Sequence, residues 1–174
     1  MNRRAFLLSS VCAATGLLLP QVVFGGKMKK MPLNFYHTHT GEKMVVHYQP
    51  GLYKGSVRRA LEYFLRDFRT GEKHPLDPLL FDSLHAIQKC CGKPATFEII
   101  SGYRSPKTNE FLRKNSSGVA RKSWHMQGRA IDIRVSGLDT AKLRDLALEH
   151  HKGGVGFYAK SDFIHLDTGR QRTW

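Results

Sequence analysis

The stretch SWHMQGRAIDIRV, residues 123–135, joins a polar loop to a short apolar segment. Residues 130–135 predict a strand, because apolar side chains dominate the run and Asp132 interrupts it. A carboxylate set between two isoleucines is costly to bury unless it has a partner. His125 and Asp132 are therefore either two ligands of one metal ion, or a loop histidine and a strand-end carboxylate with separate roles.

A second polar group lies near the end of the chain, in SDFIHLD, residues 161–167. Side chains at positions i and i+2 of a strand share one face. His165 and Asp167 are therefore expected to point the same way, while Ile164 and Leu166 face a core. A bound cation would satisfy His125, Asp132 and His165 together.

Zinc fits such a ligand set best. A catalytic zinc ion is typically held by three protein ligands and keeps its fourth position for water, and two histidines with one aspartate match that pattern. The spacing alone is weak evidence, because the chain has nine histidines. The plain alternative is that His125 or His165 only forms a hydrogen bond to an aspartate.

The rest of the chain alternates short helical and strand-like segments without repeats. The expected elements are a hairpin around the turn 39–42, helices over 57–68, 79–91 and about 139–150, a short helix after 101–105, and strands over 97–100, 130–135, 155–158 and a last one at 163–167. Asp139 is expected to cap the helix that follows it. This order predicts a single α+β domain in which helices pack on a central antiparallel sheet.

The first residues have the composition of an export signal. Arg3 and Arg4 precede an apolar run that ends near Gly25, and the pair resembles a twin-arginine signal. A membrane anchor is the alternative, but the run is short for a bilayer-spanning helix, which needs about 20 residues. We predict an export signal over residues 1–25, a mature domain over residues 26–174 and no stable membrane span.

The chain is strongly basic, with a formal net charge of +14. A basic exported protein suits an anionic polymer of the cell envelope better than nucleic acid, although a basic surface can also serve solubility alone. The residues that flank the proposed site share this charge: Lys107, Arg113, Lys114, Arg121 and Lys122.

The remaining cysteines and histidines are weaker candidates for chemistry. Cys90 and Cys91 are adjacent, so they cannot join distant segments, and we expect them to be small buried residues. The hairpin histidines at 37, 39 and 47 are expected at the surface. His150 and His151 close a predicted helix, where histidine complements the helix dipole.

Several motifs together resemble one peptidase group. Ser123-x-His125-x-x-Gly128-x-Ala130-x-Asp132 resembles the first metal motif of the LAS-type zinc peptidases, which include D-Ala-D-Ala peptidases, murein endopeptidases and the hedgehog signalling domain. The chain is most similar to the murein endopeptidase K family of exported peptidoglycan hydrolases. The resemblance covers nearly all of the mature chain and includes two further segments: Ser101-Gly102-Tyr103-Arg104-Ser105, and Phe163 to Gly169 with Arg172 and Trp174.

The resemblance implies a hedgehog-like or D-Ala-D-Ala-peptidase-like fold with one zinc ion per chain. It makes His125, Asp132 and His165 the zinc ligands. It also implies a monomeric periplasmic enzyme that acts on peptidoglycan stem peptides and cross-links, with no nucleic acid as a partner.

Three further residues are candidates for catalysis. Related dipeptidases place their base at the position of Asp162, although aspartate is shorter than their glutamate. Asp167 is an equal candidate for the base, and its alternative role is to orient a ligand histidine. The resemblance gives Arg104 the task of holding a carbonyl oxygen or a substrate carboxylate, which suits its forked donors; a structural ion pair is the alternative.

The expected function is a zinc-dependent murein endopeptidase that cleaves cross-links. A D-Ala-D-Ala carboxypeptidase or dipeptidase with the same zinc site is the first alternative, and a non-catalytic wall-binding module is the second. The sequence leaves open whether the cleaved link joins D-Ala to diaminopimelate or two diaminopimelates.

Overall fold

A mixed sheet organises the computed structural model, which describes residues 32–51, 53–91, 94–116 and 118–174. Within these ranges the sheet has seven strands in the order β2-β1-β3-β4-β6-β5-β7. The strands are β1 (Leu33–His37), β2 (Lys43–Val46), β3 (Thr96–Ser101), β4 (Ala130–Val135), β5 (Gly154–Tyr158), β6 (Phe163–Asp167) and β7 (Arg172–Thr173). The export signal predicted for residues 1–25 lies outside the described residues.

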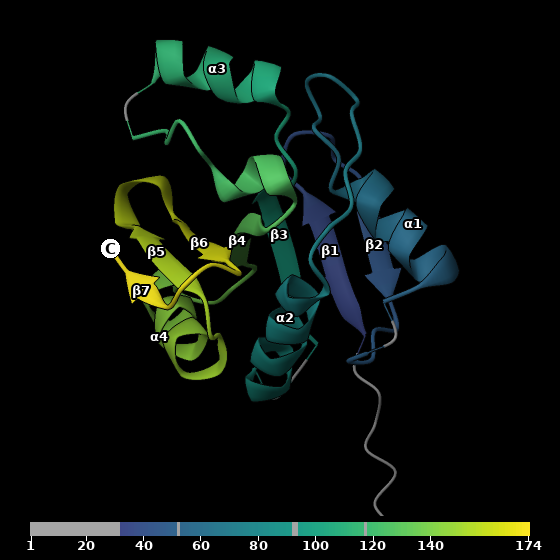
Figure 1. Ribbon diagram of the computed structural model, residues 1–174. Helices are drawn as coiled ribbons and strands as arrows, with labels where there is room; N and C mark the ends of the chain where they lie inside the picture. The colour runs from purple at the N-terminus through teal and green to yellow at the C-terminus, as the bar shows by residue number, and fades with distance from the viewer. Residues whose placement is uncertain (1–31, 52, 92–93, 117) are drawn as a thin grey trace, which may run out of the picture.

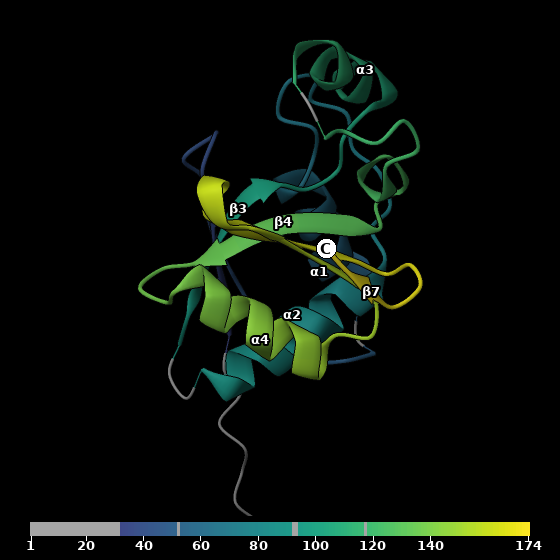
Figure 2. The same cartoon turned by 90° about the vertical axis from the view of Figure 1, so that its left-hand side faces the viewer.

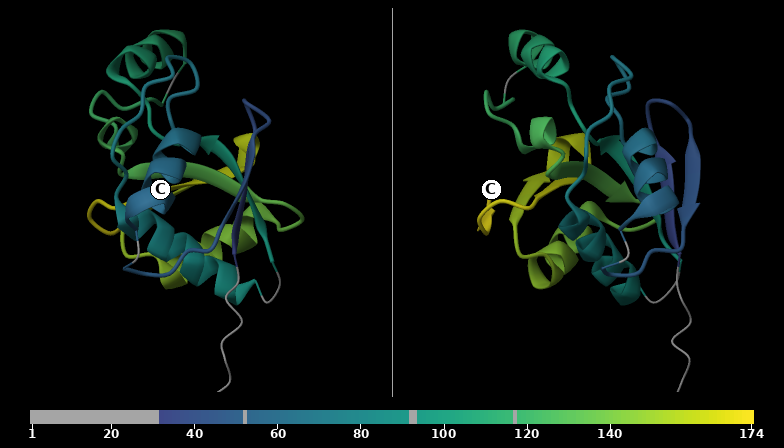
Figure 3. Two further views of the ribbon diagram at one scale, coloured as in Figure 1. Left: turned by 90° about the vertical axis from the view of Figure 1, so that its right-hand side faces the viewer. Right: turned by 45° about the vertical axis from the view of Figure 1, so that its right-hand side comes forward.

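Helices cover one face of this sheet. The helices of the described chain are α1 (Gly55–Phe64), α2 (Pro78–Cys90), α3 (Pro106–Asn115) and α4 (Thr140–His150), with short 3-10 helices η1 (Trp124–Gln127) and η2 (Ala159–Ser161). Figures 1 and 2 show α2 and α4 side by side on that face, whereas α3 stands apart at one end of the molecule. Figure 3 shows α1 next to β1. The predicted α+β single domain is confirmed.

The core forms where the apolar side chains of the sheet meet these helices. Phe35 of β1 lies between Phe64 of α1 and Phe97 of β3, with ring centroids 6.0 Å apart in both pairs. In the middle of the sheet Ile133 and Ile164 are fully buried. Burial of one such side chain contributes about 1.5–3 kcal/mol to the stability of the fold. The apolar face therefore fixes the position of β4 and β6, the strands whose other face presents Asp132 and His165.

Capping residues start the helices where the sequence indicates. The Asp139 side chain accepts a hydrogen bond from the Lys142 backbone N–H, which confirms it as the cap of α4. Asp77 caps α2 and Ser105 caps α3 in the same way. In both cases proline follows the cap, where its missing N–H costs nothing.

Two predictions about the secondary structure are wrong in detail. The helix expected to reach Phe68 ends at Phe64. Asp67 closes a turn there instead, since its side chain accepts the Arg69 N–H at 2.9 Å and its carbonyl accepts the Gly71 N–H at 2.7 Å. The strand over 163–167 is not the last, because β7 follows it.

The sheet is mostly, but not entirely, antiparallel. The pairs β1–β3 and β5–β7 are parallel, and the other four pairs are antiparallel. Both parallel pairs join strands that are not adjacent in sequence, which local patterns do not reveal. In the described part of the chain, no helix combines the length and the apolar character that a bilayer span requires.

The predicted exposure of some side chains is also wrong. Cys90 is exposed and Cys91 only half-buried, because the end of α2 leaves the core. His37 is buried rather than at the surface, since it follows Leu33 and Phe35 along the inward face of β1. His151, for which only a place at the end of a helix was expected, is buried, and its ring contacts the Ser83 hydroxyl at 2.7 Å and the Asp167 carbonyl at 2.8 Å.

Candidate metal centre

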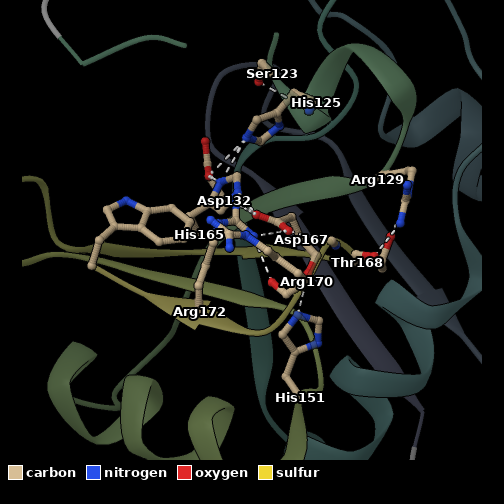
Figure 4. A network of polar contacts seen from close by, with 12 residues as sticks. Ser123, His125, Arg129, Asp132, His151, His165, Asp167, Thr168, Arg170 and Arg172 are labelled. Atoms are coloured by element: carbon tan, nitrogen blue, oxygen red, sulfur yellow. Dashed lines mark hydrogen bonds and ion pairs between the residues drawn. The ribbon is translucent and has the colours of Figure 1, made fainter.

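Three polar side chains meet on the face of the sheet opposite the helical core. Asp132 of β4 and His165 of β6 are direct partners in the antiparallel ladder, so their side chains emerge on the same face. His125 comes from η1, one turn before β4, and is almost completely buried. Figure 4 shows His125, Asp132 and His165 pointing toward one another.

The turn between His125 and β4 depends on Gly128. This residue ends η1 in the left-handed region, with φ of 64°. A side chain here would also collide with the chain, because a Cβ atom would lie 2.0 Å from the Pro75 carbonyl oxygen. Gly128 therefore lets the backbone turn between the two residues.

The spacing of the three side-chain atoms suits a tetrahedral cation. His125 Nε2 lies 3.2 Å from His165 Nδ1 and 3.2 Å from Asp132 Oδ1, and His165 Nδ1 lies 2.8 Å from Asp132 Oδ1. Ligands bound to zinc at about 2.0–2.1 Å with tetrahedral angles are about 3.3–3.4 Å apart. The triangle needs to open only slightly to hold such an ion.

The second nitrogen of each histidine has its own partner. His125 Nδ1 donates to the Gly102 carbonyl oxygen at 2.8 Å, which leaves Nε2 without a hydrogen and facing the other two groups. His165 Nε2 lies 3.1 Å from Asp167 Oδ2, which leaves Nδ1 for the site. Such outer partners fix the tautomer and orientation of metal-binding histidines, so both rings are set up as ligands.

Asp167 is fully buried behind His165 and has several partners. Its Oδ2 accepts from Arg172 Nη2 at 2.7 Å, and its Oδ1 accepts from Arg172 Nη1 at 3.0 Å and from the Gly169 N–H at 2.9 Å. Burial opposes ionisation, but these hydrogen bonds and the one to His165 hold the pKa of Asp167 well below its usual range. Asp167 is therefore a fixed carboxylate that touches the site through His165.

The protonation of the three groups shows that the site attracts positive charge. Burial lowers the pKa of His125, despite the nearby Asp132. Burial also acts against the charge of His165, but hydrogen bonds to Asp132 and Asp167 outweigh it and raise its pKa to about 9. The two histidines keep the pKa of Asp132 far below its usual range although the carboxyl is buried. A metal cation would replace the proton on His165 and meet the same negative charge.

Arg104 approaches this group from the loop after β3. Its Nη2 lies 3.7 Å from Asp132 Oδ2, and its Nη1 is 3.4 Å from the Asn109 Oδ1. Asn109 in turn donates to the Ala120 carbonyl at 3.1 Å, so it links Arg104 to the loop before η1. Burial lowers the pKa of Arg104 while Asp132 raises it; an arginine in this setting stays charged. Its Nε is buried and has no hydrogen-bond partner among the described residues.

A cavity of about 440 Å³ opens over the three groups. Its wall contains Arg104 together with aromatic side chains, those of Trp124, Tyr158, Phe163 and Trp174. Trp124 and Tyr158 therefore line this cavity rather than fill the core. Of the basic residues expected near the site, Lys122 reaches this wall, and the others are exposed.

Asp162 does not join the group. It directly follows η2 and has a left-handed backbone conformation, with φ of 52°. Its carboxylate accepts a hydrogen bond from the Thr140 hydroxyl and lies 3.5 Å from Arg134 Nη1. These residues line a separate hollow with Glu98. Among the described residues of the cavity, Asp132 has the only acidic side chain.

The sequence did not indicate Asn109 or the contacts of Trp174. Asn109 is a buried polar residue in a helix whose sequence is mostly polar, so nothing in the pattern distinguishes it. The Trp174 ring lies 5.5 Å from the His165 ring, and its N–H donates to the Tyr158 hydroxyl at 3.0 Å. Tyr103 of the SGYRS segment stacks on His74 with ring centroids 4.9 Å apart, a contact that helps to fix the conformation of that loop.

Known proteins match this chain over its whole length. A family model described as peptidoglycan L,D-endopeptidase MepK matches residues 26–174. The chain is 37% identical over 178 residues to the peptidoglycan L,D-endopeptidase MepK of Escherichia coli K12, covering 99% of this chain and 97% of that protein. It is 38% identical over 179 residues to the probable peptidoglycan L,D-endopeptidase MepK of Haemophilus influenzae, covering 99% and 95% of the two chains.

Proposed function

Because the chain belongs to the MepK family of peptidoglycan L,D-endopeptidases, we propose that it cleaves peptide cross-links of peptidoglycan with one zinc ion held by His125, Asp132 and His165. The chain is a peptidoglycan endopeptidase of the M15 metallopeptidase family. The observation that carries the zinc assignment is the triangle of His125 Nε2, Asp132 Oδ1 and His165 Nδ1 with sides of 2.8–3.2 Å. When bound in such a site, zinc lowers the pKa of a water to about 7 and polarises a carbonyl group.

In this proposal Arg104 holds the carbonyl oxygen of the scissile amide or a carboxylate of the substrate. Its guanidinium is next to the metal ligands and in the cavity wall, and Asn109 fixes one of its nitrogens. Forked donors of constant charge stabilise an oxygen that gains negative charge.

For Asp167 we propose the orienting role rather than that of the base. Both of its oxygens already accept hydrogen bonds from within the protein, and it meets the site only through His165. Asp162 lies in a different hollow and is not proposed as the base. Zinc held by His125, Asp132 and His165 would by itself lower the pKa of a water to about 7, so ionising that water would not require Asp167.

The bond that fits best is an amide between an L-centre and a D-centre. The relatives are named L,D-endopeptidases. A link between two meso-diaminopimelates has an L-configured carbonyl side and a D-configured amine side, whereas a D-Ala to diaminopimelate link joins two D-centres. We therefore propose the link between two diaminopimelates as the substrate.

We further propose export to the periplasm, followed by removal of residues 1–25. Peptidoglycan lies outside the cytoplasmic membrane, so an enzyme that acts on it has to be exported. The family model covers residues 26–174, the part predicted to remain after cleavage.

Product analysis of the zinc-loaded mature domain tests this function. The substrates are purified dimeric muropeptides with either kind of cross-link, and the products are identified by mass. Conversion of diaminopimelate-linked dimers into monomers is expected, with loss of activity after chelation and in His165→Ala. Release of a single terminal amino acid would instead identify a carboxypeptidase, and binding to sacculi without cleavage would identify a wall-binding module.

A further inference from the structure

Tyr158 lies on the same face of the sheet as the metal-binding residues. In the β5–β6 ladder Gly156 is paired with His165 and Tyr158 with Phe163. Because residues two apart on a strand share a face, the Tyr158 and Phe163 side chains follow His165 along the cavity. Both residues belong to its wall. Tyr158 is therefore a neighbour of the site that the roles proposed above do not use.

The Tyr158 ring is held by contacts on two sides. It stacks on Phe163 with ring centroids 4.6 Å apart and planes inclined by 14°. Its hydroxyl oxygen accepts a hydrogen bond from the Trp174 N–H at 3.0 Å. A phenol hydroxyl can accept and donate at once, and the contacts of Tyr158 within the described chain include no acceptor for its own hydrogen. That hydrogen is free to serve a group in the cavity.

Trp174 fixes where the hydroxyl lies. Its ring packs against the His165 ring at 5.5 Å and covers Gly156, where a Cβ atom would come within 2.6 Å of the indole. Glycine at this position is therefore what lets the indole approach. One tryptophan thus touches the ligand His165 with its ring and the Tyr158 oxygen with its N–H.

The cavity needs hydrogen-bond donors for an oxygen that gains negative charge. Amide hydrolysis passes through a tetrahedral intermediate, and donors fixed in advance around its oxygen lower the barrier. Arg104 is one such donor, since its guanidinium belongs to the same cavity wall as Tyr158. Tyr158 supplies a neutral donor from a different strand, with its ring and its acceptor lone pair already fixed.

We propose that Tyr158 is a catalytic residue whose hydroxyl donates a hydrogen bond to the scissile carbonyl oxygen as the tetrahedral intermediate forms. In this step the oxygen of an already deprotonated water bonds to the carbonyl carbon, and the carbonyl π pair moves onto the carbonyl oxygen, which takes over the negative charge. Tyr158 keeps its proton and stabilises the new charge through the hydrogen bond. The inference rests on the proposed endopeptidase function.

Tyr158→Phe tests the inference because it removes the hydroxyl and keeps the stack on Phe163. Loss of one donor of this kind lowers kcat by about 100- to 1000-fold, and we expect a fall in that range with KM changed less than about threefold. A phosphinate analogue of the cleaved dipeptide, which mimics the tetrahedral state, should lose affinity in parallel. Zinc affinity, measured by competition with a chelator, should stay unchanged. Tyr63→Phe, which removes an exposed hydroxyl from α1, is the matched control and should have wild-type kinetics.

Trp174→Phe separates this role from an effect on the cavity wall. It removes the N–H donated to Tyr158 but leaves the Tyr158 hydroxyl. A loss of kcat in Trp174→Phe as large as in Tyr158→Phe would overturn the inference, and so would wild-type kcat or wild-type affinity for the phosphinate in Tyr158→Phe. If the zinc-loaded wild-type protein cleaves no cross-linked muropeptide, the proposed function itself fails.

Discussion

Replacing Asp167 by asparagine separates an orienting carboxylate from a general base. The change keeps the size of the side chain and removes its charge. The new amide can still accept the Gly169 N–H, but it pairs less well with Arg172 and offers His165 either a neutral oxygen or an NH₂ group. If Asp167 orients His165, the substitution should weaken metal binding. If Asp167 takes a proton from water, it should lower kcat in protein that is fully loaded with metal.

The size of the effect follows from the contacts of Asp167. Loss of an outer partner of a ligand histidine lowers metal affinity by about 10- to 100-fold, which is about 1.4–2.7 kcal/mol. Removing one member of a buried ion pair costs about 3–5 kcal/mol. Arg172 retains 30% of its side-chain exposure, so water can partly solvate it and we expect a loss of about 2–3 kcal/mol in the free energy of unfolding.

Two measurements decide between the roles. Zinc affinity is obtained by titrating metal-free protein against a chelator of known affinity, and kcat is measured at saturating zinc. We expect weaker zinc binding and a kcat within about tenfold of wild type. A kcat reduced by about 1000-fold or more with unchanged zinc affinity would refute the reasoning and make Asp167 the base. Asp162→Asn is the matched control: its carboxylate lies in another hollow, so both quantities should remain near the wild-type values.

Three other predictions follow from the site and its support. Zinc at 100 times its dissociation constant should raise the free energy of unfolding by about 2.7 kcal/mol. In His125→Ala, the melting temperature should no longer depend on zinc. A zinc dependence that persists in this variant would place the metal elsewhere. Arg104→Lys should lower kcat/KM by about 100-fold, because a lysine cannot reproduce the forked contact, and kinetics close to wild type would exclude a substrate contact. Asp67 accepts N–H groups from Ser105 and Arg69, and these hydrogen bonds, together with that of Thr108, lower its pKa although burial opposes this. The stabilisation from Asp67 is therefore complete above its unfolded pKa of 3.8 and is lost as the pH falls toward the lower folded pKa. Between pH 6 and pH 3.5, the free energy of unfolding measured by chemical denaturation should decline less in Asp67→Asn than in wild type. Equal declines in the two proteins would contradict this role of Asp67.

Local patterns predicted the elements whose causes are local. The strand over residues 130–135 and the cap at Asp139 depend on neighbouring residues, and both appear as predicted. The shortened first helix depends on Asp67, whose carboxylate binds Ser105 some forty residues away. No periodicity within that helix could reveal such a contact. The burial of His37, in contrast, could have been predicted from the sequence. His37 lies two and four residues after Phe35 and Leu33 on one strand, so alternation alone puts its side chain on the same buried face.

The site shows the same division. Parity along the last predicted strand correctly placed His165 and Asp167 on one face. Spacing also suggested Asp162, three residues before His165, but the left-handed turn at Asp162 sends its carboxylate toward Thr140 and Arg134. A residue count does not report backbone conformation. Spacing alone is therefore weaker evidence for a base than for strand-borne ligands.

The charges around the cavity give the basic composition a more specific meaning than solubility. Asp132 has the only acidic side chain among the described residues of the wall, whereas Arg104, Lys122 and Arg172 all belong to it. The carboxylate of Asp167, which lies behind His165, neutralises the charge of Arg172. A divalent ion on Asp132 would add more positive charge than that carboxylate carries, so the loaded cavity would be electropositive. Such a lining draws in substrates that carry carboxylates, and free carboxylates are what distinguish peptidoglycan stem peptides from neutral peptide segments.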